Sequence, residues 1–418
     1  MQIPRERSSP IPMDTMNPCT CRDFLHAIVL GLALAASGFL GVVADAQEAA
    51  SALRVASVTP AAVQPQEQDG AVIFYDDFSQ APTEPVRYNE VVSEKGSFLW
   101  TPDGGLRGGA MRCQFEKDQV AAGALHVLLG RNPIGAGHRP EETFREVYWR
   151  VYVRHEPGWQ GNPAKLARAT CMAGRDYSQG MIAHVWGGKG DVLCIDPATG
   201  IRDSRKVTTR YNDFANLKWL GSRNTQTSIF SPAESGRWVC VESHVRLNTP
   251  GRADGVFELW VDGKLEAART DLDWHGEWQE YGINAVFLEN YCNTDGRGSV
   301  KRQARWFDNF VISTRPIGPV VAEATPTVSR TGPDDAPAWE AQVATDAEGR
   351  DIVWQSIPGE GKGRVLTIGA GQGIFTGSRA GKLSLAAGTI GWLRVRQVGE
   401  PGWSPWHAPF VAAPTARK

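Results

Sequence analysis

The chain has 418 residues, with 44 Lys and Arg against 46 Asp and Glu, which gives a formal net charge of −2 at pH 7. This length allows two domains and a large core. The balanced charge excludes a dedicated nucleic-acid-binding protein, which would carry a strong basic excess. The 15 tryptophans are informative, because a tryptophan ring is usually buried in a core and otherwise stacks on a flat partner such as a sugar ring.

The first 46 residues predict an export signal. Basic residues, among them Arg5 and Arg22, precede the apolar run 25–44, and residues 44–46 read Ala-Asp-Ala, a cleavage-site pattern. The apolar run is also long enough for an uncleaved membrane anchor. We therefore expect a secreted, periplasmic or cell-surface protein, which contacts a membrane only if this segment is retained.

Four further segments follow from composition and hydrophobic pattern. Residues 47–70 are rich in Ala, Gln, Pro and Glu and predict a disordered linker. Residues 71–318 alternate apolar and polar side chains between Gly, Pro, Asn and Asp turns, which predicts an all-β domain. Residues 319–330 predict a second linker, and 331–418 a smaller β domain.

Individual strands are clear within the larger domain. From 146 to 154 and from 238 to 247, apolar residues alternate with Arg, Tyr, Glu and His, and 257–266 predicts a hairpin around Asp262-Gly263. Further strands are expected at 283–288 and 305–313. This pattern favours a curved sandwich with one polar sheet face. An ordinary solvated face is the alternative for these polar residues.

The smaller domain carries two aromatic motifs. Residues 392–396 read Trp-Leu-Arg-Val-Arg, and 402–406 read Gly-Trp-Ser-Pro-Trp. These motifs resemble the last strands of fibronectin type III domains. The resemblance implies a small β-sandwich that spaces or tethers its neighbour and has no chemistry of its own.

Three motifs in the larger domain resemble the alginate and glucuronan lyase-like group of concanavalin A-type jelly rolls. Residues 236–251 (GRWVCVESHVRLNTPG) lead into 254–263 (DGVFELWVDG), and 305–318 (RWFDNFVISTRPIG) resemble the closing strand of the group. The resemblance covers most of residues 71–318. It implies a jelly-roll sandwich that handles polysaccharide. The group also contains binding proteins without catalysis, so a lectin-like, non-catalytic protein is the alternative function.

As a lyase, the protein would perform β-elimination at a uronic acid. This reaction needs a cation or amide on the carboxylate, a base for the C5 proton and an acid for the leaving oxygen. The resemblance implies Arg150 and Lys165 as neutralising cations, His184 as base, and Tyr148, Tyr152 or Tyr291 as proton donor. A structural histidine is the alternative for His184. The Gln-x-His pair of some alginate lyases is absent from the sequence.

A second set of residues is expected to bind substrate, namely Arg154, Trp186, His244, Arg246 and Glu242. Residues 145–210 contain eleven Arg and Lys against six Asp and Glu, which favours an anionic polysaccharide partner. A solvated basic loop explains the same charge. Glu242 and Glu258 stand alone on their strands, which argues against a glycoside hydrolase with paired carboxylates.

Structural calcium is the one cofactor that the sequence suggests. Asp76, Asp77 and Asp308 lie near the first and last predicted strands, and such hard oxygen ligands suit calcium. Turn capping is the alternative role for them. The five cysteines beyond the leader lack metal-site spacing, and one or two disulfides are plausible, with Cys171 and Cys194 the nearest pair in the chain.

Overall fold

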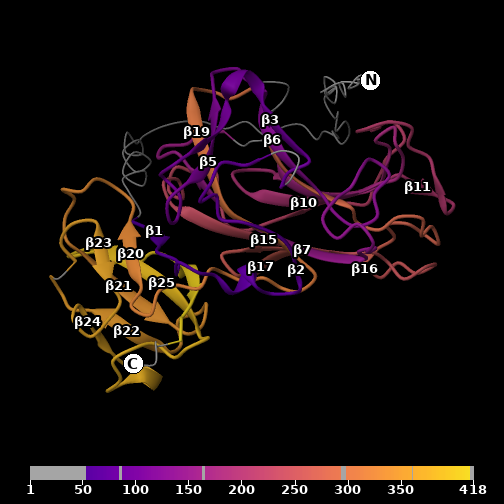
Figure 1. The fold of residues 1–418 in the computed structure, drawn as a ribbon. Coiled ribbons are helices and arrows are strands. Elements are labelled where there is room, and N and C mark those ends of the chain that lie inside the picture. The colour runs from indigo at the N-terminus through magenta and orange to yellow at the C-terminus, as the bar shows by residue number, and fades with distance from the viewer. Residues whose placement is uncertain (1–52, 84–86, 162–164, 293–297, 360, 415–418) are drawn as a thin grey trace, which may run out of the picture. The chain divides into compact units, whose positions relative to one another are not determined.

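The computed structural model describes residues 53–83, 87–161, 165–292, 298–359 and 361–414 (Figure 1). These residues form strands and three short 3-10 helices, η1 (Pro65–Glu67), η2 (Glu94–Gly96) and η3 (Gly377–Arg379). The predicted all-β class is confirmed. No helix in the described part of the chain is long and apolar enough to span a bilayer. The predicted leader, residues 1–46, lies outside the described residues.

Two eight-stranded antiparallel sheets form the larger domain, and we call them sheet I and sheet II. Sheet I has the order β13-β10-β9-β8-β18-β6-β3, with β14 also on β10. Its strands are β3 (Glu90–Ser93), β6 (Ala121–Leu128), β8 (Lys165–Met172), β9 (Gln179–Gly187), β10 (Leu193–Thr199), β13 (Lys218–Trp219), β14 (Arg223–Asn224) and β18 (Ala285–Tyr291). A separate hairpin joins β11 (Ile201–Arg202) to β12 (Arg205–Lys206).

Sheet II has the order β17-β16-β15-β7-β19-β5-β4, with β2 also on β19. Its strands are β2 (Val72–Asp76), β4 (Phe98–Thr101), β5 (Ala110–Phe115), β7 (Glu146–His155), β15 (Trp238–Arg246), β16 (Gly255–Val261), β17 (Lys264–Leu272) and β19 (Gln303–Ser313). The hairpin predicted at Asp262-Gly263 joins β16 to β17.

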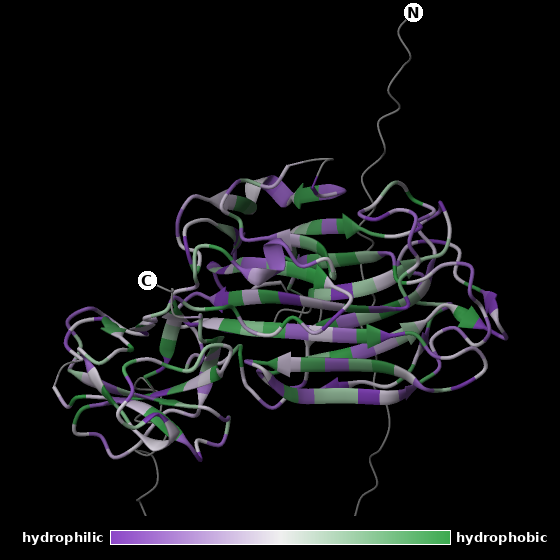
Figure 2. Cartoon of the chain, turned by 60° about the horizontal axis from the view of Figure 1, so that its bottom comes forward, coloured by the Kyte–Doolittle hydropathy of each residue, from purple (hydrophilic) through white to green (hydrophobic). Residues whose placement is uncertain are grey.

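The core of the larger domain lies between the two sheets. Alternate side chains, such as Val151 of β7 and Val185 of β9, are buried in one shared cluster. Figure 2 shows the alternation as green and purple bands along the strands. A two-residue period places every second side chain on the opposite face of each sheet. The functional candidates therefore divide between two outer faces.

Residues 53–60 do not form the linker that composition predicted. The segment contains β1 (Val55–Val58), which pairs with β20 (Thr327–Arg330), and β20 pairs with β23 (Val365–Thr367). Val55 is fully buried there. The expectation of a linker over 319–330 is likewise corrected, because β20 lies within it. A four-residue strand shows too little alternation to be recognised, and its partner is more than 250 residues away in the chain.

A five-stranded sheet completes the smaller domain, in the order β24-β22-β21-β25-β26. Its strands are β21 (Trp339–Ala344), β22 (Ile352–Ser356), β24 (Gly373–Phe375), β25 (Ile390–Gln397) and β26 (His407–Val411). Arg394 of β25 packs over the rings of Trp403 and Trp406, at 4.8 and 4.4 Å. The small β-sandwich is present, and the likeness to fibronectin type III domains stays a prediction.

All five cysteines in the described residues are free and buried. Cys171 belongs to the core between the sheets, whereas Cys194 lies opposite Trp186 in the register of β9 and β10. The two therefore lie on opposite faces of sheet I, which explains why the pair nearest in sequence is not bonded.

Candidate functional site

One row of polar and aromatic side chains crosses the outer face of sheet I. The register aligns one residue from each of six neighbouring strands in this row. The row consists of Glu90, His126, Phe287, Arg168, His184 and Asp196. Side chains in register on one face of a sheet are direct neighbours. The row therefore places the predicted His184 on one surface with five residues that the sequence did not single out.

A register shift adds Lys165 to this face. Lys165 and Arg168 are three apart, so strict alternation would place them on opposite faces. The pairing of β8 with β9 shifts between Lys165 and Ala167. Lys165 therefore lies opposite both Trp186 and Tyr291 in neighbouring strands. Such a bulge redirects a side chain, and here it gathers three of the predicted residues.

Lys165 and Arg168 share one carboxylate. The Oε1 atom of Glu289 lies 3.6 Å from Nζ of Lys165 and 3.1 Å from Nη2 of Arg168. Burial lowers the pKa of both cations, and Glu289 opposes this effect. Burial raises the pKa of Glu289, but Arg168 and Lys165 outweigh it, so the pKa lies below its ordinary value. With all three groups ionised, the triad carries one net positive charge.

Aromatic rings surround this triad. The guanidinium of Arg168 lies between the rings of Tyr211 and Phe287, at 4.8 and 5.1 Å. The ammonium of Lys165 lies 5.1 Å from the ring centre of Tyr291. Cation–π contacts of this kind hold a cation in place without neutralising it. Tyr291 is half-buried, so part of its side chain is accessible to a ligand bound on this face.

His184 lies beneath two tryptophans. Its ring stacks on Trp186 with centres 4.2 Å apart, and Trp219 lies 5.6 Å away. Nδ1 of His184 is 3.3 Å from the carbonyl oxygen of Asp196, and Nε2 has no hydrogen-bond partner among the described residues. Burial, with the charges of Arg168 and Lys165, holds the pKa of His184 well below its ordinary value. The ring is therefore uncharged at neutral pH, but it is only 1% exposed.

Several buried polar atoms on or behind this face lack hydrogen-bond partners within the described part of the chain. Besides Nε2 of His184 they include Nε of Arg168, Oε2 of Glu289 and Nδ2 of Asn290. Buried polar groups are normally hydrogen-bonded, and exceptions call for a ligand, water or function. The arrangement has unused hydrogen-bonding capacity around one positive charge, which suits an anionic, hydroxyl-rich ligand.

Asp196 is the second acid on this face and differs from Glu289. Burial raises its pKa to about 7, against a hydrogen bond with Trp186 that lowers it. A carboxyl group with such a pKa exchanges its proton near neutral pH. Asp196 therefore makes the charge of this end of the row dependent on pH.

The outer face of sheet II holds the remaining predicted residues in structural contacts. Arg150 donates to the carbonyl oxygen of Gly318 at 2.8 Å, and Glu242 accepts from the backbone N–H groups of Ile317 and Gly318. The hydroxyl of Tyr152 accepts from the N–H of Val320 at 3.0 Å. These three side chains fix the segment that leaves the larger domain. They lie on the opposite sheet from Lys165 and His184.

His244 is likewise held by neighbours on sheet II. Its ring stacks on Tyr148 at 4.1 Å, and its two nitrogens contact Glu258 and Glu146 at 2.8 and 2.7 Å. Arg154 lies between Trp238 and Trp306, at 5.0 and 4.6 Å. Arg246 donates to the carbonyl oxygen of Asp254.

The three aspartates predicted to bind calcium accept hydrogen bonds from the protein. Asp76 accepts from the N–H of Phe78 and the hydroxyl of Tyr88. Asp77 accepts from the N–H of Ser79, and Asp308 from the N–H groups of Leu106 and Asn309. Within the described ranges, no group of three or more His, Cys, Asp or Glu side chains has a metal-binding arrangement. Turn capping accounts for these contacts, and the calcium site stays a prediction.

Sequence reasoning missed Arg168, Glu289, Asp196 and Trp219 on sheet I. Arg168 has a local signal, because it stands between two alanines in a strand that is buried along its whole length. Glu289 and Asp196 have no such signal, because a single acidic residue in an apolar strand is equally consistent with a solvated side chain and with a site residue. Their role depends on the strand order, which places β18 beside the consecutive strands β8, β9 and β10 from a separate part of the chain.

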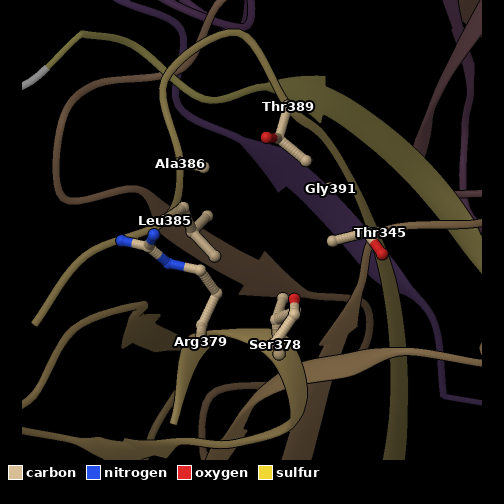
Figure 3. Close-up of a pocket in the computed structure, with 8 residues that line it drawn as sticks. Thr345, Ser378, Arg379, Leu385, Ala386, Thr389 and Gly391 are labelled. Atoms are coloured by element: carbon tan, nitrogen blue, oxygen red, sulfur yellow. The ribbon is translucent and has the colours of Figure 1, made fainter. Parts of the chain in front are cut away.

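A small pocket of the described residues lies in the smaller domain (Figure 3). It is lined by Thr345, Val353, Ser378, Arg379, Leu385, Ala386, Thr389 and Gly391. The guanidinium of Arg379 is turned to the carbonyl oxygen of Ser384. No titratable group other than Arg379 lines this pocket, so it offers little chemistry, and the outer face of sheet I is the candidate site.

No family model matches the chain, and no curated protein does. Among solved structures, a Chlorella virus alginate lyase shares 14% identity at a TM-score of 0.43, covering 58% of this chain and 100% of its own. An endo-β-1,4-glucuronan lyase from Trichoderma reesei shares 13% at 0.41, covering 58% and 96%. An alginate lyase from Aplysia kurodai shares 14% at 0.38, covering 58% and 99%. At this level of similarity, neither the role of a residue nor a substrate can be assigned to this chain from these structures.

Proposed function

We propose that the protein is a polysaccharide lyase that cleaves a uronic-acid-containing polymer by β-elimination on the outer face of sheet I. The carrying observation is the triad of Lys165, Arg168 and Glu289, whose net positive charge lies beside the half-buried Tyr291. A uronate carboxylate placed against Lys165 would have part of its charge neutralised, which makes the C5 proton more acidic.

The proposed reaction uses side chains that already lie together. In one route Tyr291, as the phenolate, takes the C5 proton, the C4–O bond breaks as the C4–C5 double bond forms, and Tyr291 returns the proton to the leaving oxygen. In the other route the uncharged His184 takes the C5 proton and the hydroxyl of Tyr291 gives its proton to the leaving oxygen. Arg168 touches Lys165 only through Glu289, so it holds the cation in position.

Trp219 is proposed to position the polymer. It belongs to β13 at the edge of sheet I and is 38% exposed, and it lies in stacking range of Trp186 and Phe214. Half-exposed aromatic rings beside a polar row suit the apolar face of a sugar ring. Lys218 and Arg223, both exposed, extend the positive charge at the same edge.

The second candidate function is carbohydrate binding without turnover. The burial of His184 under Trp186 favours it, because a base with 1% exposure is poorly placed to reach a substrate. Binding needs only the charge and the aromatic rings of the same face. Export, and an extracellular or periplasmic site of action, belong to either proposal.

The test is to mix the purified chain with alginate, glucuronan, hyaluronan and a neutral glucan and to follow the ultraviolet absorbance of unsaturated uronate. We expect absorbance to rise with at least one polyuronate and not with the glucan. No rise with any polymer, together with retardation in gels that contain one of them, would reject the lyase and support the binding protein. Neither response would reject both.

A further inference from the structure

Arg305 is a fully buried arginine in the core of the larger domain. It belongs to β19 of sheet II and pairs in register with Cys113 of β5 and His155 of β7. Its side chain is 0% exposed and packs against the rings of Phe115 and Phe307, at 5.7 and 5.1 Å. It therefore extends into the space between the sheets and not into solvent.

The guanidinium of Arg305 binds the back of sheet I. Its Nε donates to Oδ1 of Asn290 at 2.7 Å, and its Nη2 donates to the carbonyl oxygens of Lys165 at 2.9 Å and Glu289 at 2.7 Å. The acceptors belong to β8 and β18, the two strands that carry the triad. One side chain from sheet II therefore joins both site strands from behind.

The same acceptors lie at irregularities of the sheet. The pairing of β18 with β8 shifts between Leu288 and Tyr291, and that of β8 with β9 shifts between Lys165 and Ala167. These shifts set which side chains reach the outer face. Backbone carbonyls at a bulge are left out of the regular ladder and need other donors. Arg305 supplies donors at both places.

An arginine buried in this position lowers the stability of the folded protein. In the described part of the chain, no carboxylate lies within ion-pair distance of Arg305, and its Nη1 has no hydrogen-bond partner. Burying a cation without a paired charge destabilises the fold, and a well-packed apolar side chain is often neutral or stabilising in its place. Core packing therefore does not explain Arg305, whereas its contacts with the site strands do.

We propose that Arg305 is a positioning residue for the site on sheet I, whose guanidinium fixes the two register shifts and so sets the spacing of Lys165, Glu289 and Tyr291. The inference rests on the function proposed above. Arg305 acts through the backbone and touches no substrate.

The test compares Arg305→Met and Arg305→Lys with Arg330→Met in the full chain. Arg330 is a matched control, because it is also fully buried and donates to the backbone carbonyls of Gly363, Thr331 and Pro333, all in the smaller domain. Initial rates are measured against polymer concentration, with thermal unfolding in parallel. We expect Arg305→Met to lower kcat by roughly 10- to 100-fold, with a smaller change in KM. Arg305→Lys should be intermediate, and Arg330→Met should leave kcat unchanged.

A kcat for Arg305→Met within twofold of wild type would overturn the proposal, as would an equal loss in Arg330→Met. If Arg305→Met does not fold, Arg305→Lys carries the same comparison. If wild type cleaves no polymer, the proposed lyase fails, and backbone hydrogen exchange decides the role of Arg305 separately. Faster exchange confined to β8 and β18 supports positioning, and unchanged exchange in these strands contradicts it.

Discussion

On the outer face of sheet II, arginine, tyrosine and glutamate side chains form hydrogen bonds with the backbone of the protein. Arg150, Tyr152 and Glu242 all bond to the backbone of residues 317–320. Among the described residues, Arg168, His184 and Glu289 on the outer face of sheet I leave polar atoms without partners, whereas Arg150 on sheet II leaves only its Nε. Residue type does not separate the two faces, but the balance of partners does. The face with unused donors and acceptors is the one that we assign to the ligand.

The largest expected difference between the faces comes from two tyrosines. Tyr291→Phe removes the proposed proton-transfer group and should lower kcat by about 100-fold or more, within the range for general acid–base catalysis. Tyr152→Phe removes only the acceptor for Val320, so it should cost about 1 kcal/mol of stability and leave kcat unchanged. Steady-state rates and denaturant unfolding of both variants check this. Equal rates for the two variants would remove the distinction between the faces.

Substituting one glutamate on each sheet compares the two faces by the free energy of unfolding. Glu289→Gln leaves two buried cations without a counter-charge and should lower the free energy of unfolding by roughly 3–5 kcal/mol. Glu258→Gln on sheet II leaves His244 its second carboxylate, Glu146, and should cost less than about 1 kcal/mol. Urea unfolding at neutral pH measures both. A Glu289→Gln protein as stable as wild type would show that the triad is not charged as described.

Asp196 should make sheet I sensitive to pH. Because its pKa is raised to about 7 in the folded state, the folded protein holds this proton more tightly than the unfolded chain does. Its contribution to stability is therefore fully present below about pH 4 and is lost as the pH rises to about 7. Asp196→Asn should recover stability at pH 8, by at most about 4 kcal/mol, and should change little at pH 4.

Unfolding curves for wild type and Asp196→Asn at several pH values provide the measurement. Asp308, whose pKa burial raises to about 8, is present in both proteins, so its effect cancels in the difference. A difference that does not change with pH would contradict the assignment. The same ionisation should weaken polyuronate binding above pH 7, and Asp196→Asn should remove this trend.

The smallest effect is expected from the tryptophans. Trp219→Ala should raise KM or the dissociation constant several-fold, because it removes one exposed stacking surface and leaves the triad intact. Trp306→Ala on sheet II, which exposes Arg154, should lower the melting temperature and leave binding unchanged. Retardation in polymer gels and thermal unfolding distinguish the two. Equal binding loss in both variants would mean that the polymer does not select one face.

The sequence predicted the strands of the larger domain well, because their two-residue alternation is a local property. The strands expected at 146–154, 238–247 and 305–313 are found as β7, β15 and β19 with boundaries shifted by one or two residues. The site was predicted only in part. Lys165, His184, Trp186 and Tyr291 lie together, whereas the candidates from 148–154 and 242–246 lie on the opposite sheet.

The strands were predicted better than the site because alternation shows that a strand has two faces but not which sheet it joins. Strand order is set by long-range pairing, and the shift that turns Lys165 outward is a one-residue irregularity with no sequence signal. The short strand β1 was missed for a related reason, since its partner β20 is distant in the chain.

The central claim, that polysaccharide binds sheet I and not sheet II, is tested most directly by hydroxyl-radical footprinting with mass spectrometry. The full chain is oxidised with and without a saturating polyuronate, with a neutral glucan as control. We predict that the polyuronate protects Trp186, Trp219 and Tyr291 and leaves the oxidation of Trp306 and Tyr148 unchanged. Protection of Trp306 and Tyr148, with Trp219 still reactive, would contradict the account.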